Sequence, residues 1–538
     1  MIVCALVGLM TCVAVGRDVR PIDYRFSFQE AAQHRMNVEV TFTDLPDGPL
    51  QLRISRSSPG RYSLHDFASA IDGMMVTTMD GTPLAVAHGQ SNEWTVAEPS
   101  RNVRVRYTVS ANTIDGTYAA IDDTHAHLNM PAVILWAPGL EHRPARVALV
   151  ARPEGAPDWQ AATQLFPTDD PLVFTAPTFQ YLMDSPIEFG RIVWRTFEAT
   201  VPSGAATATP TIRIALHHLG TDAEADAFAD ATRQIVEQAR QVFGEFPPYE
   251  RNTYTVLADY LPSARNDGME HRNSTVLTSE RALATARVKL LDAVAHEFFH
   301  GWNVERIRPR SLEPFDFSRA NVSGELWFAE GVTSYYDGVL MARAGLWPLD
   351  DLLGDLGAAV SKVATSPAVR VRSAEEMSRL APDVDSFSGG ADAATTTNYI
   401  SYYTFGAALG LGFDFTIRER TGGAASLDDV MRVLWREFGR PGGREIGYVD
   451  RPYTAADIRR AIAQVSGDEA LAAALMARYV EGHEVMDYRR LVELAGLMVR
   501  ERAANEQSPP QPLEIVAFED AGRTPSPSQL AFRQRWLH

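Results

Sequence analysis

The sequence predicts a multidomain α+β protein, and three observations support this prediction. The chain has 538 residues, which is too long for one hydrophobic core, so about two to four domains are expected. Its first part alternates apolar and polar residues with a period of two, which is typical of half-buried strands. Its later part shows helical periodicity. We expect an N-terminal antiparallel β domain at 17–215, a mixed domain at 216–422 and a C-terminal helical domain at 423–500.

The N-terminal domain is expected to be a β-sandwich or an open antiparallel sheet. Clusters of Pro, Gly and Asp separate its strands, which we place at MNVEVTF, LQLRISR, NVRVRYTV, ARVALVAR, IVWRTFEATV and TIRIALHH. His217 and His218 close the last strand, and a pair of histidines is able to bind a metal. Because no third ligand lies near them in the sequence, we interpret both as ordinary surface residues.

The segment 1–16, MIVCALVGLMTCVAVG, is an apolar run of signal-peptide length. It is too short to span a bilayer as a stable helix, and it contains both cysteines, Cys4 and Cys12. Its removal would leave a mature chain with no stable membrane span, no disulfide and no Cys-bound metal. We therefore expect a periplasmic or secreted protein. Lipidation at Cys12 is the alternative, because Leu9-Met10-Thr11-Cys12 is similar to a lipoprotein box.

Composition excludes one class of partner. The net charge is −18, and no part of the sequence supplies a basic groove for phosphates, so nucleic acid is not an expected partner. The hydrophobic content of 45% and the charged content of 22% are ordinary for a globular protein.

A metal site is indicated by LDAVAHEFFHGWN at residues 291–303. His296 and His300 stand four residues apart, and Glu297 follows the first of them. Apolar residues recur at steps of three and four from Val288, and no proline or glycine interrupts 288–300, so a helix is predicted. A helix places both imidazoles on one face, where they reach one Zn²⁺ with Glu297 beside its bound water. The alternative is two unrelated histidines on a helix face.

A third ligand is expected in GELWFAEGVTSYYDG, residues 324–338. A catalytic zinc takes three protein ligands, and Glu330 supplies a carboxylate in an apolar, aromatic segment. A buried carboxylate without compensation is costly, and a metal is the compensation that fits. The alternative is an arginine partner from the intervening loop: Arg306, Arg308 or Arg310.

These motifs resemble a known family. HEFFHGWNVERIRP followed by LWFAEG is similar to the glycyl-aminopeptidase family of zinc metallopeptidases, a gluzincin family, and more distantly to aminopeptidase N. Further matching stretches are SPGRY with HDFA at 58–68, GMEHRNS at 268–274, and NYISYYTFGAALGLGFDFTIR at 398–418. The resemblance covers about residues 20–500 and implies a thermolysin-like catalytic domain at 216–422.

The end of the chain departs from that family. Many relatives continue into a PDZ module, but the 38 residues after Arg500 are too few for one. The sequence QSPPQP within them indicates that 501–538 is a tail or a linker remnant.

The resemblance also implies catalytic roles. Glu297 would act as the general base, and Tyr403 would donate a hydrogen bond to the oxygen on which negative charge grows. Tyr402 is the alternative donor, because Phe405 replaces a lysine that is usual in the wider group.

Glu270 and Gly268 are the expected substrate-binding residues. Glu270 would hold the α-ammonium of a peptide, and Gly268 would let the backbone approach the substrate. The alternative is a solvated loop in which Glu270 pairs with Arg272.

We thus predict a zinc-dependent aminopeptidase acting on peptides, with glycine or alanine as the first residue by resemblance. The alternatives are a thermolysin-like endopeptidase, for which Glu270 would be irrelevant, and an inactive extracytoplasmic peptide-binding protein.

Overall fold

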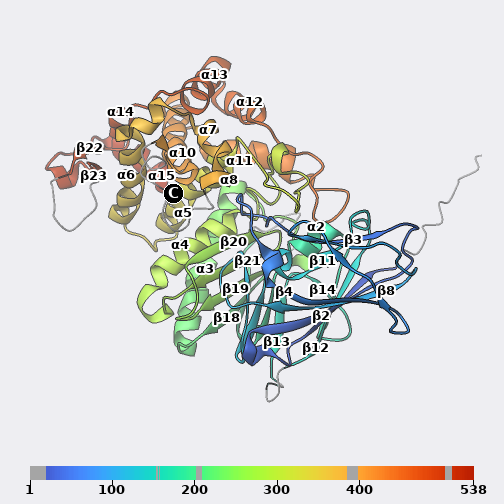
Figure 1. The fold of residues 1–538 in the computed structure, drawn as a ribbon. Coiled ribbons are helices and arrows are strands. Elements are labelled where there is room, and N and C mark those ends of the chain that lie inside the picture. Colours follow the sequence, from blue (N-terminus) through green and yellow to red (C-terminus); the bar gives the residue numbers. More distant parts are fainter. Residues whose placement is uncertain (1–19, 153–155, 157, 202–208, 385–397, 503–511) are drawn as a thin grey trace, which may run out of the picture.

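The computed structural model describes residues 20–152, 156, 158–201, 209–384, 398–502 and 512–538. In Figure 1, β-sheets occupy the N-terminal part of the chain, and helices cover the C-terminal part. The expected signal peptide at 1–16, with Cys4 and Cys12, lies outside the described residues.

Within the described residues, the N-terminal part contains three sheets. The largest has eight strands in the order β14-β15-β12-β1-β2-β8-β4-β5 and is antiparallel except between β1 and β12. Its strands are β1 (Ile22–Ser27), β2 (Arg35–Phe42), β4 (Ile71–Thr78), β5 (Pro83–Leu84), β8 (Val103–Ser110), β12 (Ala145–Ala151), β14 (Phe166–Pro167) and β15 (Val173–Ala176). The predicted antiparallel β structure is therefore confirmed, apart from one parallel pair.

Two smaller antiparallel sheets complete this part. One has the order β11-β3-β7-β6, with β3 (Leu50–Ile54), β6 (Ala87–His88), β7 (Glu93–Val96) and β11 (Leu135–Trp136). The other has the order β13-β16-β10-β9, with β9 (Ala119–Ile121), β10 (His125–Leu128), β13 (Gln160–Thr163) and β16 (Ile187–Gly190). The short helices α1 (Met130–Val133) and α2 (Phe179–Met183) lie between strands.

Strand alternation explains the core of this part. Along β2, every second residue is buried, from Met36 to Phe42, because successive side chains of a strand point to opposite faces. These side chains belong to one apolar core with the aromatic residues of β1 and β16.

A five-stranded mixed sheet begins the catalytic part. Its order is β17-β18-β19-β21-β20, and β18 pairs in parallel with β19, which pairs in parallel with β21. Its strands are β17 (Val193–Glu198), β18 (Thr211–His218), β19 (Thr253–Tyr260), β20 (Asp267–His271) and β21 (Ser274–Ser279). We expected β17 and β18 to belong to the N-terminal domain, but β18 pairs with β19 of the following sheet. The alternation of apolar and polar residues predicts that these segments are strands, but it does not indicate which sheet they join.

Two long helices cover this sheet. α3 (Asp222–Phe243) begins at a capping box between Thr221 and Glu224, and α4 (Leu283–Phe299) carries the predicted metal-binding motif. Both contribute to a single apolar core with the helices that follow.

Most of the remaining helices continue that core without a break. They are a π-helical segment at Trp327–Val332, α5 (Thr333–Arg343), α6 (Leu349–Thr365), α7 (Ala374–Arg379), α10 (Tyr402–Arg420), α11 (Leu427–Leu434), α12 (Ala455–Ser466), α13 (Glu469–Leu475) and α14 (Tyr488–Glu493). The catalytic and C-terminal helical parts therefore share one interior. The short helix α8 (Ala381–Val384) packs its Ala381 in a separate small cluster with Tyr62 and Tyr402.

The prediction that 501–538 is a tail or linker remnant is wrong for the described part of that segment. β22 (Leu497–Glu501) pairs with β23 (Leu513–Ala517), and α15 (Pro527–Leu537) follows. Trp536 is fully buried, and its indole N–H donates to the Tyr335 hydroxyl at 2.9 Å. A few large apolar residues anchor this end of the chain, although its overall composition is polar.

No helix among the described residues combines the length and the apolarity that crossing a membrane requires.

Candidate metal centre and active site

Helix α4 places the two histidines of the motif on one face. It buries Leu291, Val294 and Phe298 against the core, whereas Val288, expected on the buried face, is 44% exposed. The Nε2 atoms of His296 and His300 lie 3.1 Å apart. The helical prediction for this motif therefore agrees with the structure.

Glu330 reaches the histidines from the π-helical segment Trp327–Val332. Its Oε2 lies 3.3 Å from His300 Nε2 and 3.8 Å from His296 Nε2. This segment touches α10 backbone to backbone, since a Cβ on Gly406 would lie 1.9 Å from the Trp327 carbonyl oxygen. Only glycine fits at position 406. The close contact between the two backbones therefore determines where Glu330 lies relative to the histidines.

The ring nitrogens of His296 and His300 that face away from Glu330 also have polar partners. His296 Nδ1 lies 3.1 Å from Asp337 Oδ2, and His300 Nδ1 lies 2.5 Å from the Asn303 carbonyl oxygen. Because a carbonyl only accepts, His300 carries a proton on Nδ1, and Nε2 is the ring nitrogen that faces Glu330. Metal-ligating histidines are oriented by hydrogen bonds of this kind.

The donor atoms of His296, His300 and Glu330 all lie within 4.8 Å of one another. Tetrahedral ligands at about 2.0–2.2 Å from one ion are separated by about 3.3–3.6 Å, close to the spacings observed here. The residues therefore fit a metal ion. The alternative of an arginine partner for Glu330 is wrong. Arg308 pairs with Glu305 and Glu313, Arg306 donates to the Arg272 and Gly301 carbonyls, and Arg310 donates to the Pro452 carbonyl.

Glu330 has a further partner from the N-terminal domain. The Tyr62 hydroxyl donates to Glu330 Oε1 at 2.5 Å. Burial raises the pKa of Glu330, but the positive charges of His300 and His296 outweigh burial and hold this pKa well below its usual range. Glu330 therefore carries its negative charge in the buried site.

Glu297 is buried beside these ligands. Its Oε2 has no hydrogen-bond partner among the described residues. A Cβ on Gly268 would lie 2.2 Å from Glu297 Oε1, so the backbone of β20 lies directly against this carboxylate. Burial raises the pKa of Glu297 to about 7, with the two histidines opposing the shift and the charges of Glu270 and Glu330 adding to it.

Glu270 also faces this site from β20. It is only 5% exposed, and its carboxylate lies within 4.8 Å of donor atoms of Glu297 and His300. The alternative of a solvated loop is wrong, because Arg272 pairs with Glu250 at 2.9 Å. Burial is the main cause that raises the pKa of Glu270 to about 7.

Tyr403 lies in the first turn of α10, close to His296. Its ring centroid is 6.0 Å from that of His296, and its side chain is half-buried. Tyr402 is 1% exposed and packs edge-on against Tyr62. Of the two tyrosines, Tyr403 is thus the one whose ring lies beside His296 and remains partly exposed.

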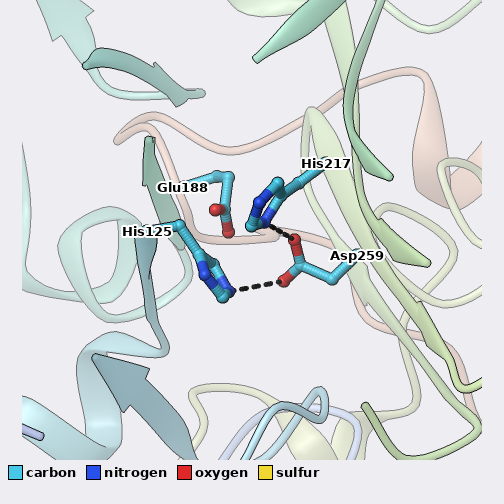
Figure 2. Close-up of side chains that lie close together, drawn as sticks. All are labelled: His125, Glu188, His217 and Asp259. Atoms are coloured by element: carbon cyan, nitrogen blue, oxygen red, sulfur yellow. Dashed lines mark ion pairs between the residues drawn. The ribbon is translucent and has the colours of Figure 1, made fainter. Parts of the chain in front are cut away.

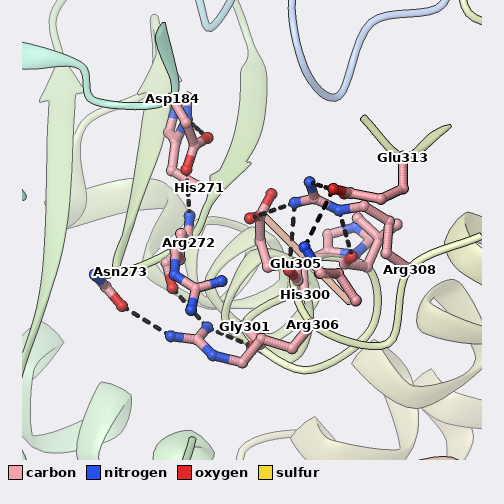
Figure 3. A network of polar contacts seen from close by, with 12 residues as sticks. Asp184, His271, Arg272, Asn273, His300, Gly301, Glu305, Arg306, Arg308 and Glu313 are labelled. Carbon is pink, nitrogen blue, oxygen red and sulfur yellow. Dashed lines mark hydrogen bonds and ion pairs between the residues drawn. The ribbon is translucent and has the colours of Figure 1, made fainter. Parts of the chain in front are cut away.

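A buried polar network fixes α4 relative to the β20–β21 hairpin (Figure 3). Arg306, 1% exposed, donates to the Gly301 carbonyl at 2.9 Å, to the Arg272 carbonyl at 2.7 Å and to Asn273 Oδ1 at 2.9 Å. One guanidinium therefore links the turn after His300 to the turn between β20 and β21.

Two family models match the chain. The Peptidase M61 N-terminal domain matches residues 23–191, and the M61 glycyl aminopeptidase model matches residues 289–409. The chain belongs to the M61 glycyl aminopeptidase family. The resemblance inferred from the motifs is thereby confirmed, and this M61 protein is a metallo-aminopeptidase that cleaves peptide bonds.

Solved structures share the fold of this M61 peptidase. An aminopeptidase N family protein from Idiomarina loihiensis superposes with a TM-score of 0.75 at 24% identity, over 90% of this chain and 82% of that one. An M1 zinc metallopeptidase from Deinococcus radiodurans has a TM-score of 0.50 at 14% identity, over 87% of this chain and 95% of that one. A comparison with curated protein sequences found no significant match.

Sequence reasoning missed two side chains of the M61 site. Asp337 stands seven residues after Glu330, which is two helical turns, so helical periodicity could have placed both on one face. Tyr62 lies in the SPGRY stretch, but nothing local indicates that it reaches Glu330, 268 residues later.

Proposed function

We propose that this M61 peptidase is a zinc-dependent aminopeptidase that removes N-terminal residues from peptides. The convergence of His296, His300 and Glu330 beside the unpartnered carboxylate of Glu297 supports this proposal most strongly. Imidazole nitrogens with one carboxylate are a donor set that suits zinc, and three protein ligands leave a coordination position free.

Zn²⁺ held by these three residues would polarise the scissile carbonyl and acidify water near it. Glu297 accepts a proton from the attacking water while the water oxygen bonds to the carbonyl carbon. Glu297 then gives that proton to the amine nitrogen as the C–N bond breaks. Tyr403 donates a hydrogen bond to the carbonyl oxygen, which gains negative charge during the attack.

Glu270 distinguishes an aminopeptidase from an endopeptidase. We assign its carboxylate to the α-ammonium of the substrate, since a charge-assisted hydrogen bond there fixes the first peptide bond at the reacting groups. Its position beside Glu297 and His300 supports this role. Gly268, two residues earlier on β20, keeps the backbone of that strand close to Glu297.

A preference for glycine or alanine as the first residue is also proposed. The matching family model, described as a glycyl aminopeptidase, supports this preference. We further propose a periplasmic or secreted location, on the basis of the apolar segment 1–16.

The test compares aminoacyl anilides that carry a free or a blocked N-terminus. Wild type should strongly prefer the free substrates, with Gly and Ala above Leu. Glu270→Ala should lose about 1.5 to 3 kcal/mol in kcat/KM on free substrates, because a hydrogen bond to a charged group is removed, and should lose little on blocked ones.

The blocked substrates serve as the internal control for damage to the site. Equal losses on both substrate classes would show that Glu270 only shapes the site. Equal wild-type rates on free and blocked substrates would favour the thermolysin-like endopeptidase.

A further inference from the structure

A second cluster of metal-binding side chains lies where two sheets meet. His125 of β10 and Glu188 of β16 come from one sheet, and His217 of β18 and Asp259 of β19 come from the other. Figure 2 shows the four side chains pointing towards one another. Their candidate donor atoms all lie within 4.8 Å of one another. The interpretation of His217 as an ordinary surface residue is therefore wrong, because strands distant in sequence supply the partners that were missing.

These side chains are buried, and their inward-facing polar atoms are unsatisfied. His125, Glu188 and Asp259 are at most 2% exposed, and the His217 side chain is 12% exposed. Within the described residues, no hydrogen-bond partner exists for His125 Nε2, His217 Nδ1, Asp259 Oδ1 or either carboxylate oxygen of Glu188. The nearest ion pair of Glu188 is long, with Oε2 3.4 Å from His127 Nδ1. Buried polar groups are rarely left in this state, and one cation would be a common partner for these five atoms.

The outward-facing atoms of the cluster are held by neighbours. His125 Nδ1 lies 3.0 Å from Thr124 Oγ1, which leaves Nε2 directed inward. His127 donates from Nε2 to the Asp115 carbonyl at 2.8 Å, and its Nδ1 lies 3.0 Å from Asp259 Oδ2. Support of this kind orients the histidine and carboxylate ligands of known metal sites.

A network of hydrogen bonds alone does not account for the remaining spacings. His217 Nδ1 lies 3.5 Å from Asp259 Oδ1, and His125 Nε2 lies 3.9 Å from Asp259 Oδ2. These distances are long for hydrogen bonds but similar to those between ligands of one ion, as at His296, His300 and Glu330.

We propose that His125, Glu188, His217 and Asp259 form a second metal site, for a transition-metal dication such as Zn²⁺. Two imidazoles with two carboxylates suit zinc, and four protein ligands close the coordination shell, which is the arrangement of a structural site. The ion would join the sheet of β10 and β16 in the N-terminal domain to the sheet of β18 and β19 in the catalytic domain. This site shares no residue with the peptidase centre, so it does not rest on the proposed function.

The test measures zinc by mass spectrometry after saturation and removal of free metal. Wild type should hold about two zinc ions per chain, and His217→Ala and His300→Ala should each hold about one. The matched control is His218→Ala, on the same strand, where His218 Nδ1 accepts from the Gly220 N–H outside the cluster. This control should hold two.

Each outcome separates the two sites. One zinc in wild type and none in His300→Ala would overturn the second site and leave the peptidase centre intact. One zinc in wild type, retained in His300→Ala and lost in His217→Ala, would support the second site and contradict the first.

A measurement on wild type avoids dependence on variants that fold poorly. Anomalous diffraction at the zinc edge should show a peak between His125 and Asp259; only solvent density or no density there would overturn the proposal. Zinc should also raise the Tm of His300→Ala, and should not raise that of the double variant His217→Ala/His300→Ala.

Discussion

At the scale of single residues, three carboxylates share one small buried space. Glu270, Glu297 and Glu330 come from β20, α4 and the π-helical segment, and each lies near a histidine of the motif. Like charges so close together are costly in a low-dielectric interior unless a cation accompanies them. This crowding is the electrostatic reason to expect a metal ion at the centre of the site.

Tyr403 is predicted to act mainly in the transition state. Tyr403→Phe should lower kcat by roughly 10²- to 10³-fold with little change in KM, because the lost hydrogen bond forms only as charge grows on the oxygen. Steady-state kinetics on a free aminoacyl anilide provides the measurement.

The neighbouring tyrosine is the matched control. Tyr402 is buried against Tyr62, so Tyr402→Phe should affect stability more than kcat. A large kcat loss in Tyr402→Phe with none in Tyr403→Phe would shift the catalytic assignment by one residue.

At the scale of elements, the contact between α10 and the π-helical segment sets the position of Glu330. A Cβ on Gly406 would lie 1.9 Å from the Trp327 carbonyl oxygen, and backbone cannot move away as a flexible side chain does. Gly406→Ala should therefore destabilise the fold by about 1 to 3 kcal/mol and weaken zinc binding at this centre. Denaturant unfolding and zinc titration measure the two effects.

A second helical glycine provides the control for the alanine substitution itself. Gly354 in α6 is exposed, and a Cβ there would meet nothing within 4 Å. Gly354→Ala should stabilise the protein by about 0.4 to 1 kcal/mol and leave zinc binding unchanged. Equal stability of Gly406→Ala and Gly354→Ala would contradict the steric role of the α10 contact.

At the scale of the whole molecule, the N-terminal domain contributes a side chain to the candidate metal centre. Tyr62 and Glu330 belong to different domains, and the hydroxyl of one binds the carboxylate of the other. Tyr62→Phe should weaken zinc affinity by about 10- to 100-fold, because a hydrogen bond that orients a metal ligand is lost. Competition with a chelator measures this affinity.

A tyrosine inside the N-terminal domain tests whether that effect is specific. Tyr107 donates to the Val133 carbonyl at 3.0 Å, within the N-terminal core. Tyr107→Phe should alter stability but not zinc affinity. Equal zinc affinity in Tyr62→Phe and wild type would mean that the domain contact has no part in metal binding.

The sequence predicts best where local periodicity decides the structure. One turn of helix brings His296 and His300 together, so their relation follows from a spacing of four. The interpretation of His217 is wrong because Asp259 lies beside it through the pairing of β18 with β19, and Glu188 approaches it from another sheet; spacing in the sequence encodes neither contact. The C-terminal segment was misread because Trp536 makes contacts that its polar surroundings do not indicate.

The most direct test of the proposed chemistry is Glu297→Gln, measured for both zinc content and turnover. The amide keeps the shape of the side chain but removes its basicity. The variant should retain all the zinc of wild type and lose about 10²- to 10⁴-fold in kcat. Near-normal turnover with full zinc would contradict the assignment of Glu297 as the base that activates water.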